Sequence, residues 1–412
     1  MLIGFSPLHF ATVLVISLVY LWTLYNLPIL LVGVKSLRKE KKRKLSTFVG
    51  KLPFVSVIVP VKNEECVVGR LLKALVDLDY PKDRREFIIV EEGSSDGSGE
   101  ICRKFGDKHS DVHYICGGVG NGKPSALMAA FKHIRGDIVG VFDADSVPER
   151  DVLLRVVEHF KDGKIGALQG RVCAINGGEN MLTRFVAQEE ALRYEGLMRG
   201  KEELGLFVPL NGSCYFVRKD VLDSVGGWDV GALSEDMDLA ARLVDNGYKI
   251  RYAGDVRSWQ EYPSSVGEFF RQRVRWFRGT MEAGLKYGKL LRHPSLMRFD
   301  AEVTMAGPFV FLSFVMGYLI PVLALVWPFR VDFGSLFFAN FTMVLSFVLL
   351  ALAGGVMIYS SRPRRLRSVL WLPFVYLYWF IQNFIAAYAL LQIVFRRPRC
   401  WSKTKKTGNT DK

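Results

Sequence analysis

Four long stretches of this chain contain no aspartate, glutamate, lysine or arginine, and they limit what the chain can fold into. They are Ala11–Val34, Val303–Phe329, Phe333–Ser361 and Ser368–Phe395. Each exceeds the roughly 20 apolar residues that a helix needs to cross a bilayer. Half of the residues are hydrophobic and the mean hydropathy is +0.17, which is too apolar for a purely soluble enzyme. We expect an N-terminal membrane helix within residues 1–34 and a C-terminal membrane region at 303–395.

The charges that follow the first apolar stretch predict its orientation. The segment KSLRKEKKRK after Val34 has seven basic residues and one acid. Basic flanks stay in the cytoplasm, so we expect the juxtamembrane linker 35–50 and the chain up to residue 302 to be cytoplasmic. The first stretch does not read as a cleaved signal peptide, because it is too long and its basic residues follow it.

The last apolar stretch conflicts with this charge rule. If 368–395 crosses the membrane, the basic tail 396–412 lies outside. A re-entrant or interfacial segment keeps the tail in the cytoplasm, and we favour that interpretation. The basic clusters also explain most of the net charge of +14, so anionic lipid headgroups account for it better than nucleic acid, for which no motif occurs.

Residues 51–290 have a different pattern, in which apolar runs rich in valine, isoleucine and phenylalanine alternate with helical patterns. The predicted strands are 55–61, 86–92, 112–116 and 137–145, and the predicted helices lie near 64–77, 97–107 and 123–135. This alternation predicts an α/β domain with a mostly parallel sheet covered on both faces. Ligands bind such sheets beyond the carboxyl ends of the strands, where this chain reads VPVKNEE, VEEGSSDGS and VFDADSVP.

Asp143 and Asp145 directly follow a predicted strand. Two carboxylates one residue apart at a strand end can converge on one Mg²⁺ or Mn²⁺, cations that prefer oxygen ligands and bridge phosphates. The alternative is a solvated turn before Pro148. The strand context favours a metal site.

Glu235 and Asp236 lie in the segment LSEDMD. Ser234 is placed to cap a helix, and Asp236 and Asp238 in its first turn would favour the helix dipole. The functional alternative is a general base held at the start of a helix, beside a site for metal and phosphate.

The stretch 263–289 combines phenylalanine, arginine and tryptophan. This composition is typical of an amphipathic helix on a membrane surface. Arginine also binds diphosphates bidentately, and tryptophan provides a flat face for a sugar ring. Both interpretations apply to the segment RQRVRW at 271–276.

Two other classes of site are disfavoured. The run from Gly117 to Lys123 fits GxxxxGK and suggests an ATP-driven transporter subunit, but Pro124 stands where a hydroxyl must reach Mg²⁺. The six cysteines have no CxxC spacing, which argues against a disulfide scaffold and a structural zinc site.

Taken in order, the motifs resemble the membrane-integrated family 2 glycosyltransferases, such as the cellulose, hyaluronan and poly-N-acetylglucosamine synthases. The motifs are VPVKNEE, EEGSSD, GNGKPSAL, DAD, QGR, LNGSCYF, GGWD followed by SED, QRVRW and a tail tryptophan. The resemblance covers nearly the whole chain. It implies a Rossmann-like GT-A domain and an inverting transfer from a UDP-sugar, with UDP-N-acetylglucosamine or UDP-glucose favoured.

The resemblance also implies a role for each matching residue. Glu64, Glu91 and Glu92 would line the base and ribose, Lys123 would lie near the diphosphate, and Asp143 and Asp145 would hold the nucleotide and its Mg²⁺ or Mn²⁺. Asp236 would be the base beside Glu235, while Gln272, Arg275 and Trp276 would bind the diphosphate and the acceptor, and Trp401 would cover the loaded site. Glu91-Glu92-Gly93 departs from the family's Asp-Asp-Gly, which puts the base preference in doubt; Ser234 for threonine is a mild change.

The expected function is transfer to a polysaccharide or glycolipid at the cytoplasmic face of the cell membrane. A single addition to a lipid or polyprenyl-phosphate is the alternative. An inactive scaffold is a further one, against which the intact acidic set argues. Asn340, Gln382 and Asn383 either line a polymer path or bond between helices. Three C-terminal segments are few for a channel, which a second copy or a partner could complete. The sugar, acceptor and linkage stay open.

Overall fold

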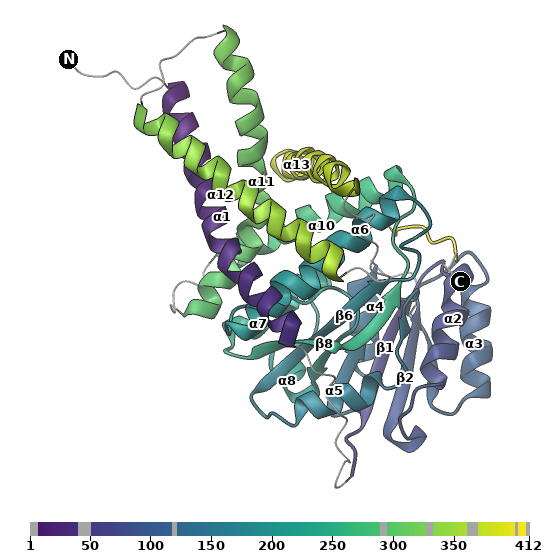
Figure 1. Ribbon diagram of the computed structural model, residues 1–412. Helices are drawn as coiled ribbons and strands as arrows, with labels where there is room; N and C mark the ends of the chain where they lie inside the picture. The colour runs from purple at the N-terminus through teal and green to yellow at the C-terminus, as the bar shows by residue number, and fades with distance from the viewer. Residues whose placement is uncertain are drawn as a thin grey trace.

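The computed structural model describes residues 7–39, 51–117, 122–288, 295–326, 333–360, 370–399 and 403–408. It consists of an α/β domain from which long apolar helices rise (Figure 1). The helices are α1 (Pro7–Lys39), α2 (Glu65–Val76), α3 (Ser98–Lys108), α4 (Lys123–Phe131), α5 (Val152–Phe160), α6 (Met181–Leu192), α7 (Arg199–Glu203), α8 (Lys219–Ser224), α9 (Glu235–Asp245), α10 (Val266–Tyr287), α11 (Leu296–Val326), α12 (Phe333–Ser360) and α13 (Leu372–Val394). The described residues also include a 3₁₀ turn (Lys82–Arg84) and a π-helical turn (Arg193–Met198).

One eight-stranded sheet forms the centre of the α/β domain. Its strands are β1 (Val55–Val61), β2 (Arg85–Glu91), β3 (Val112–Cys116), β4 (Ile138–Val141), β5 (Val147–Pro148), β6 (Ile165–Ala174), β7 (Tyr215–Arg218) and β8 (Lys249–Gln260), in the order β3-β2-β1-β4-β7-β6-β8-β5. The first four in that order are mutually parallel, β7 is antiparallel to both of its neighbours, and β6 and β8 are parallel again. The predicted mostly parallel sheet is confirmed.

The predicted strands and helices of the first half agree with the structure within a few residues. The exception is the expected strand 137–145, which ends at Val141. The amide of Phe142 still donates to the carbonyl of Ile58 at 3.1 Å, and the chain then leaves the ladder. Because β4 ends at Val141, Asp143 and Asp145 lie in the loop that follows the strand. This loop also places them beyond the carboxyl end of the neighbouring β1.

Hydrophobic burial explains why the parallel strands read as continuous apolar runs. Six of the seven residues of β1 and all seven of β2 are buried, because helices cover the sheet. The amphipathic α2 contributes Val68, Leu71 and Leu75 to the same core. Only the strand ends and the loops after them therefore remain available for polar chemistry.

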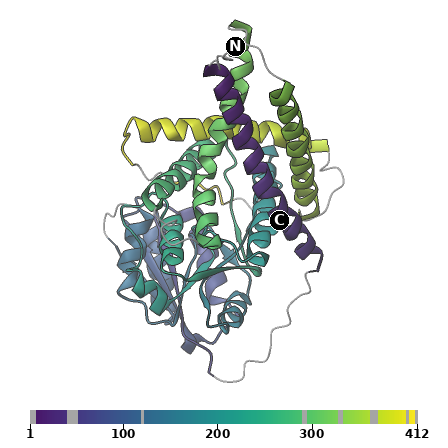
Figure 2. The same cartoon turned by 90° about the vertical axis from the view of Figure 1, so that its left-hand side faces the viewer.

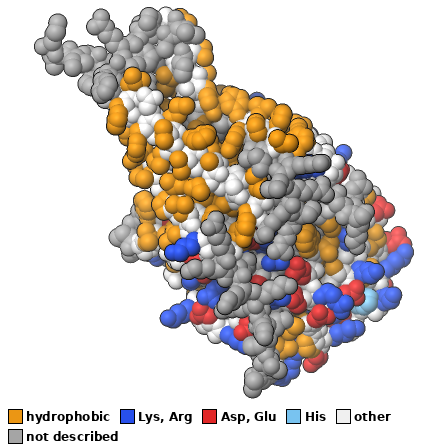
Figure 3. Space-filling model, in the orientation of Figure 1, with side chains coloured by type: hydrophobic (Ala, Val, Ile, Leu, Met, Phe, Trp, Pro, Cys, Tyr) orange, Lys and Arg blue, Asp and Glu red, His pale blue; other side chains and the backbone are white. Residues whose placement is uncertain are grey.

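Within the described part of the chain, four helices are long and apolar enough to cross a membrane: His9–Leu37, Leu296–Ile320, Leu336–Tyr359 and Pro373–Val394. Apolar side chains gather over this part of the surface, whereas charged ones gather over the α/β domain (Figure 3). α1 packs against both α11 and α12. α13 lies across these helices instead of beside them (Figure 2). Its direction suits the interfacial interpretation of 368–395, which stays a prediction.

α10 connects the domain to the apolar helices. It packs against α9 on one side and against α11 and α13 on the other. Phe269, Gln272, Arg273 and Arg278 are among its buried residues. The helix thus lies between the sheet domain and the apolar helices, and Gln272, Arg273 and Arg278 face protein, whereas Arg271 and Lys286 are exposed.

Candidate active site

One cavity of about 420 Å³ lies beyond the carboxyl ends of β1 and β4. It brings together residues from the whole length of the chain. Of the predicted site residues, those that line it are Glu64, Glu92, Lys123, Asp143, Asp145, Glu235, Asp236, Gln272, Arg275 and Trp276. Among the described side chains, these candidates therefore share one space although they lie more than 200 residues apart in sequence.

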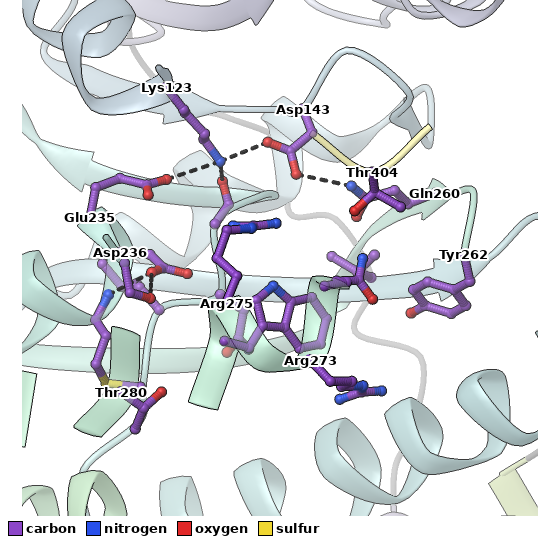
Figure 4. A pocket seen from close by; sticks show the side chains of 18 of the residues that line it. Lys123, Asp143, Glu235, Asp236, Gln260, Tyr262, Arg273, Arg275, Thr280 and Thr404 are labelled. Carbon is purple, nitrogen blue, oxygen red and sulfur yellow. Dashed lines mark hydrogen bonds and ion pairs between the residues drawn. The ribbon is translucent and has the colours of Figure 1, made fainter. Parts of the chain in front are cut away.

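Lys123 is the buried cation at the centre of the acidic set (Figure 4). Its Nζ lies 2.7 Å from Asp143 Oδ1 and 3.1 Å from Glu235 Oε1, and it donates to the carbonyl of Gly212 at 2.6 Å. Burial acts to lower the pKa of Lys123, but the carboxylates of Asp143 and Glu235 raise it above its ordinary value. Lys123 is therefore held charged, within reach of an anionic group entering the cavity.

Asp143 and Asp145 are joined by a shared donor. Gln260 Nε2 donates to Asp143 Oδ2 and to Asp145 Oδ1, both at 2.9 Å. Burial acts to raise the pKa of Asp143, but the Lys123 ammonium outweighs it and holds that pKa below its usual range. Two adjacent carboxylates, one of them kept ionised, match the oxygen ligands that Mg²⁺ and Mn²⁺ prefer. The described residues contain no group of three His, Cys, Asp or Glu side chains gathered for a metal, so the pair would need other oxygens to complete a coordination shell.

The C-terminal tail enters the same cavity. Lys406 Nζ lies 2.6 Å from Asp145 Oδ2, where it supplies positive charge to that carboxylate. Thr407 and Gly408 donate their amides to the carboxylate of Glu261, and Lys403 Nζ lies 3.1 Å from Glu64 Oε2. The described tail residues therefore lie on the α/β domain.

Glu64 has an unusual environment. Burial, together with the negative charge of Asp145, raises the pKa of Glu64 to about 8, although Lys403 acts in the opposite direction. A carboxyl group with this pKa is mostly protonated at neutral pH. It can then donate a hydrogen bond as well as accept one.

Glu235 and Asp236 begin α9, as the sequence predicts. Asp236 Oδ1 accepts from Ser234 Oγ at 2.7 Å and from the amide of Met237 at 2.8 Å. Ser234 occupies the capping position, but its side chain bonds Asp236 instead of a helix amide, which corrects the expectation of a side-chain cap. Burial raises the pKa of Glu235 despite the nearby Lys123. The first turn of α9 thus presents an oriented carboxylate to the cavity.

The residues of the QRVRW segment lie on α10. Burial lowers the pKa of Arg275, although Glu235, Asp143 and Asp236 act against this shift. The indole of Trp276 has the guanidinium carbons of Arg273 and Arg193 at 4.7 and 5.9 Å from its ring centroid. Gln272 Oε1 is buried without a hydrogen-bond partner, so this oxygen is able to accept a further hydrogen bond.

The loop residues 210–212 line the cavity, and the side chain of Gln169 holds this loop in place. Gln169 Oε1 accepts from the amide of Asn211 at 2.8 Å, and its Nε2 donates to the carbonyl of Ser213 at 3.0 Å. Gly212 has φ +68°, and a Cβ there would lie 3.3 Å from Asp236 Oδ2 and 3.4 Å from Lys123 Nζ. Glycine at 212 therefore permits both the turn and the close approach of the Asp236 and Lys123 side chains to this loop.

One described residue of the predicted site lies elsewhere. Glu91 is buried, accepts from the amide of Ser94, and is absent from the residues that line the cavity. Trp401 lies outside the described residues. The sequence reasoning missed Gln260, Arg193, Asn211, Lys403 and Lys406. Of these five residues, only Lys403 and Lys406 had a signal in the sequence, which was the basic composition of the tail.

Comparison with known proteins places this geometry in a family. Residues 53–279, more than half of the chain, match the family described as "Glycosyltransferase like family 2". The β-monoglucosyldiacylglycerol synthase of Synechocystis is 34% identical over 57% of this chain and 49% of its own. The poly-β-1,6-N-acetyl-D-glucosamine synthase of Staphylococcus epidermidis is 27% identical over 70% of this chain and 71% of its own. The chain spans only 49 to 66% of the length of the relatives that are 32 to 34% identical to it over the aligned region.

A solved structure shows the same fold. The mannosyltransferase PcManGT of Pyrobaculum calidifontis, described in complex with GDP-Man and Mn²⁺, superposes with a TM-score of 0.60. It covers 93% of this chain and 100% of its own, at 18% identity. The predicted GT-A architecture and the predicted family are both confirmed. The chain belongs to the family 2 glycosyltransferases, and long apolar helices flank its GT-A domain.

Proposed function

We propose that this enzyme transfers a sugar from a UDP-sugar, UDP-N-acetylglucosamine or UDP-glucose, to a polysaccharide or glycolipid acceptor at the cytoplasmic face of the membrane. The observation that carries the proposal is the meeting of Asp236, Lys123 and Asp143 in one cavity. An oriented base, a buried cation and an ionised carboxylate are the groups that displacement of a nucleoside diphosphate needs.

Asp236 acts as the general base. Ser234 and the amide of Met237 hold one carboxylate oxygen, so the other is available for the proton of the acceptor hydroxyl. That hydroxyl oxygen attacks the anomeric carbon as the bond to the diphosphate breaks, and the configuration of the carbon inverts. The carbon has oxocarbenium character in the transition state, as in glycoside hydrolysis.

The leaving diphosphate gains charge at the opposite side. Lys123 and Arg275 are the cations that face it, and preorganised charge of this kind is usually the largest catalytic contribution. Asp143 and Asp145 would hold a Mg²⁺ or Mn²⁺ ion, which supplies Lewis-acid stabilisation of phosphate oxygens when bound. The protonated carboxyl of Glu64 and the side chain of Glu92 would contact the ribose or the base.

Gln272 and Trp276 belong to the acceptor side. The buried Oε1 of Gln272 would accept from an acceptor hydroxyl, and the indole would stack on a sugar ring. The relatives named for glucosyldiacylglycerol and for poly-N-acetylglucosamine support both kinds of acceptor. Because the family includes relatives named for each kind of product, the addition of a single sugar is the alternative to polymer synthesis.

The test is release of nucleoside diphosphate by the purified membrane protein. A panel of UDP- and GDP-sugars is supplied with Mg²⁺ or Mn²⁺ and with membrane lipids. Release from one UDP-sugar, with the sugar recovered in a new product, is the expected result. Folded protein that stays silent with every donor and acceptor would instead favour an inactive scaffold.

A further inference from the structure

The cavity that contains Asp236 has a second end, formed by membrane helices. There its wall passes from α10 to α1 and α11, and it is lined by Trp22, Phe277, Gly307, Pro308 and Phe311. Both α1 and α11 are long and apolar enough to span a bilayer. The cavity therefore leads from a carboxylate to an apolar wall at the level of the membrane.

Trp22 and Gly307 determine the shape of this wall. A Cβ built on Gly307 would lie 3.0 Å from Cη2 of Trp22, closer than ordinary van der Waals contact. Phe277 and Phe311 meet edge to face, with their centroids 5.4 Å apart. Glycine at 307 thus lets the indole rest on α11, and any larger residue would push it or fill the space beside it.

This end of the cavity provides few charged groups that could bind an anionic acceptor. Among the described residues, those of α1 and α11 that line the cavity carry no charge, and Thr304 is the one with a hydroxyl. Of the three arginines that line the cavity, Arg193 pairs with Glu190, Arg273 pairs with Glu189, and Arg275 is the one assigned to the diphosphate. A phosphate on the acceptor would have to displace one of these ion pairs.

The polar residues of the membrane region do not extend the cavity into a polar path. Among the described residues, neither Asn340 nor Gln382 nor Asn383 lines it. Gln382 donates to Glu189 Oε1 at 2.8 Å, so its role is to bond α13 to the sheet domain. A hydrated polymer needs polar groups along its route, whereas an aliphatic chain needs a wall of the kind that Trp22 and Phe311 provide.

We propose that the acceptor is a neutral lipid with a free hydroxyl in its headgroup, such as diacylglycerol or a glycosylated diacylglycerol. The lipid reaches the cavity from the bilayer along α1 and α11, and Trp22 and Gly307 are specificity-determining residues for its apolar part. Its hydroxyl oxygen forms the new bond to the anomeric carbon, the bond to the diphosphate breaks, and Asp236 takes the proton. The inference rests on the proposed function and names the substrate class for that site.

The test compares two glycine substitutions on membrane helices. Gly307→Leu fills the apolar end, whereas Gly355→Leu on α12 adds the same side chain where a Cβ meets nothing within 4 Å. Both enzymes, and the wild type, receive labelled UDP-sugar with vesicles of phosphatidylcholine containing dioleoylglycerol, with polyprenyl phosphate, or with soluble oligosaccharides. Donor binding is measured separately by calorimetry.

The expected result is a labelled neutral lipid from the dioleoylglycerol vesicles. Gly307→Leu should reduce kcat/KM for that lipid by about tenfold or more, as added bulk in an apolar pocket does, with donor binding unchanged. Gly355→Leu should match the wild type. Trp22→Ala removes bulk from the same wall and should also raise KM for the lipid. This second variant keeps the inference testable if Gly307→Leu misfolds.

Other results would overturn the inference. Label only in polyprenyl phosphate or in a lengthening oligosaccharide would show an anionic or a polymeric acceptor. Equal rates in Gly307→Leu and Gly355→Leu would remove the role of the α1–α11 wall. Failure of the wild type to bind any nucleotide sugar would instead overturn the proposed function itself, and the separate binding measurement distinguishes the two failures.

Discussion

Replacement of Asp236 by asparagine isolates the proton transfer from the rest of the site. Asparagine has nearly the same shape, and its Oδ1 can still accept from Ser234 Oγ and from the amide of Met237, which lie 2.7 and 2.8 Å from the native carboxylate oxygen. The substitution therefore removes the base without removing its anchoring. General base catalysis contributes about 10²- to 10⁴-fold, so we expect kcat to fall by that factor, which is about 2.7–5.4 kcal/mol in activation free energy.

The assay is steady-state release of nucleoside diphosphate, together with donor binding by calorimetry. Donor affinity should change little, because Asp236 acts on the acceptor hydroxyl. Ser234→Ala is the matched control: it removes one of the two anchoring hydrogen bonds and keeps the carboxylate, so its loss should be about tenfold. Near-normal turnover in Asp236→Asn would refute the assignment of the base.

Three further predictions follow from the ion pairs of the cavity. Lys406→Met should tighten Mn²⁺ binding by about tenfold or more, which is about 1.4 kcal/mol, because the Lys406 ammonium no longer pairs with the Asp145 carboxylate. Electron paramagnetic resonance of free Mn²⁺, without substrate, measures this affinity. Lys123→Met should lower the free energy of unfolding by about 3–5 kcal/mol, because it leaves the Asp143 and Glu235 carboxylates without their buried cation. Denaturant titrations measure this loss, and the double variant Lys123→Met with Glu235→Gln should recover part of it. The pKa of the Glu64 carboxyl is raised to about 8, so the folded state binds a proton that the unfolded state has lost. The free energy of unfolding should therefore fall as the pH rises from about 4.5 to 8, by at most about 1.4 kcal/mol per pH unit. Glu64→Gln should flatten this slope in thermal unfolding, and an unchanged slope would contradict the reasoning.

Local patterns were sufficient for the first half of the sheet. The run VSVIVPV forms β1 with the predicted bounds, because strands buried on both faces read as continuous apolar segments. The expectation that polar motifs gather at the strand ends is confirmed for Asp143 and Asp145. The predicted strand over 137–145 is too long, since the chain turns at Phe142 to present those carboxylates. Apolar periodicity continues through such a turn and does not mark it.

The second half of the sheet and the tail contacts depend on distant residues. β7 runs antiparallel between β4 and β6, and nothing in the four-residue segment YFVR announces that direction. Gln260 joins Asp143 and Asp145 across more than 100 residues of sequence. The pairing of Lys406 with Asp145 spans more than twice that separation. A single sequence shows the residue types at these positions but not which of them meet.

The stereochemistry of the product tests the central claim most directly. A single displacement by a hydroxyl that Asp236 deprotonates must invert the anomeric carbon. ¹H nuclear magnetic resonance of the product made from an α-linked UDP-sugar should therefore show a β-glycosidic bond in the new product. An α-linked product would require a different route, such as two successive displacements, and would contradict the role of Asp236 as the base of a single displacement.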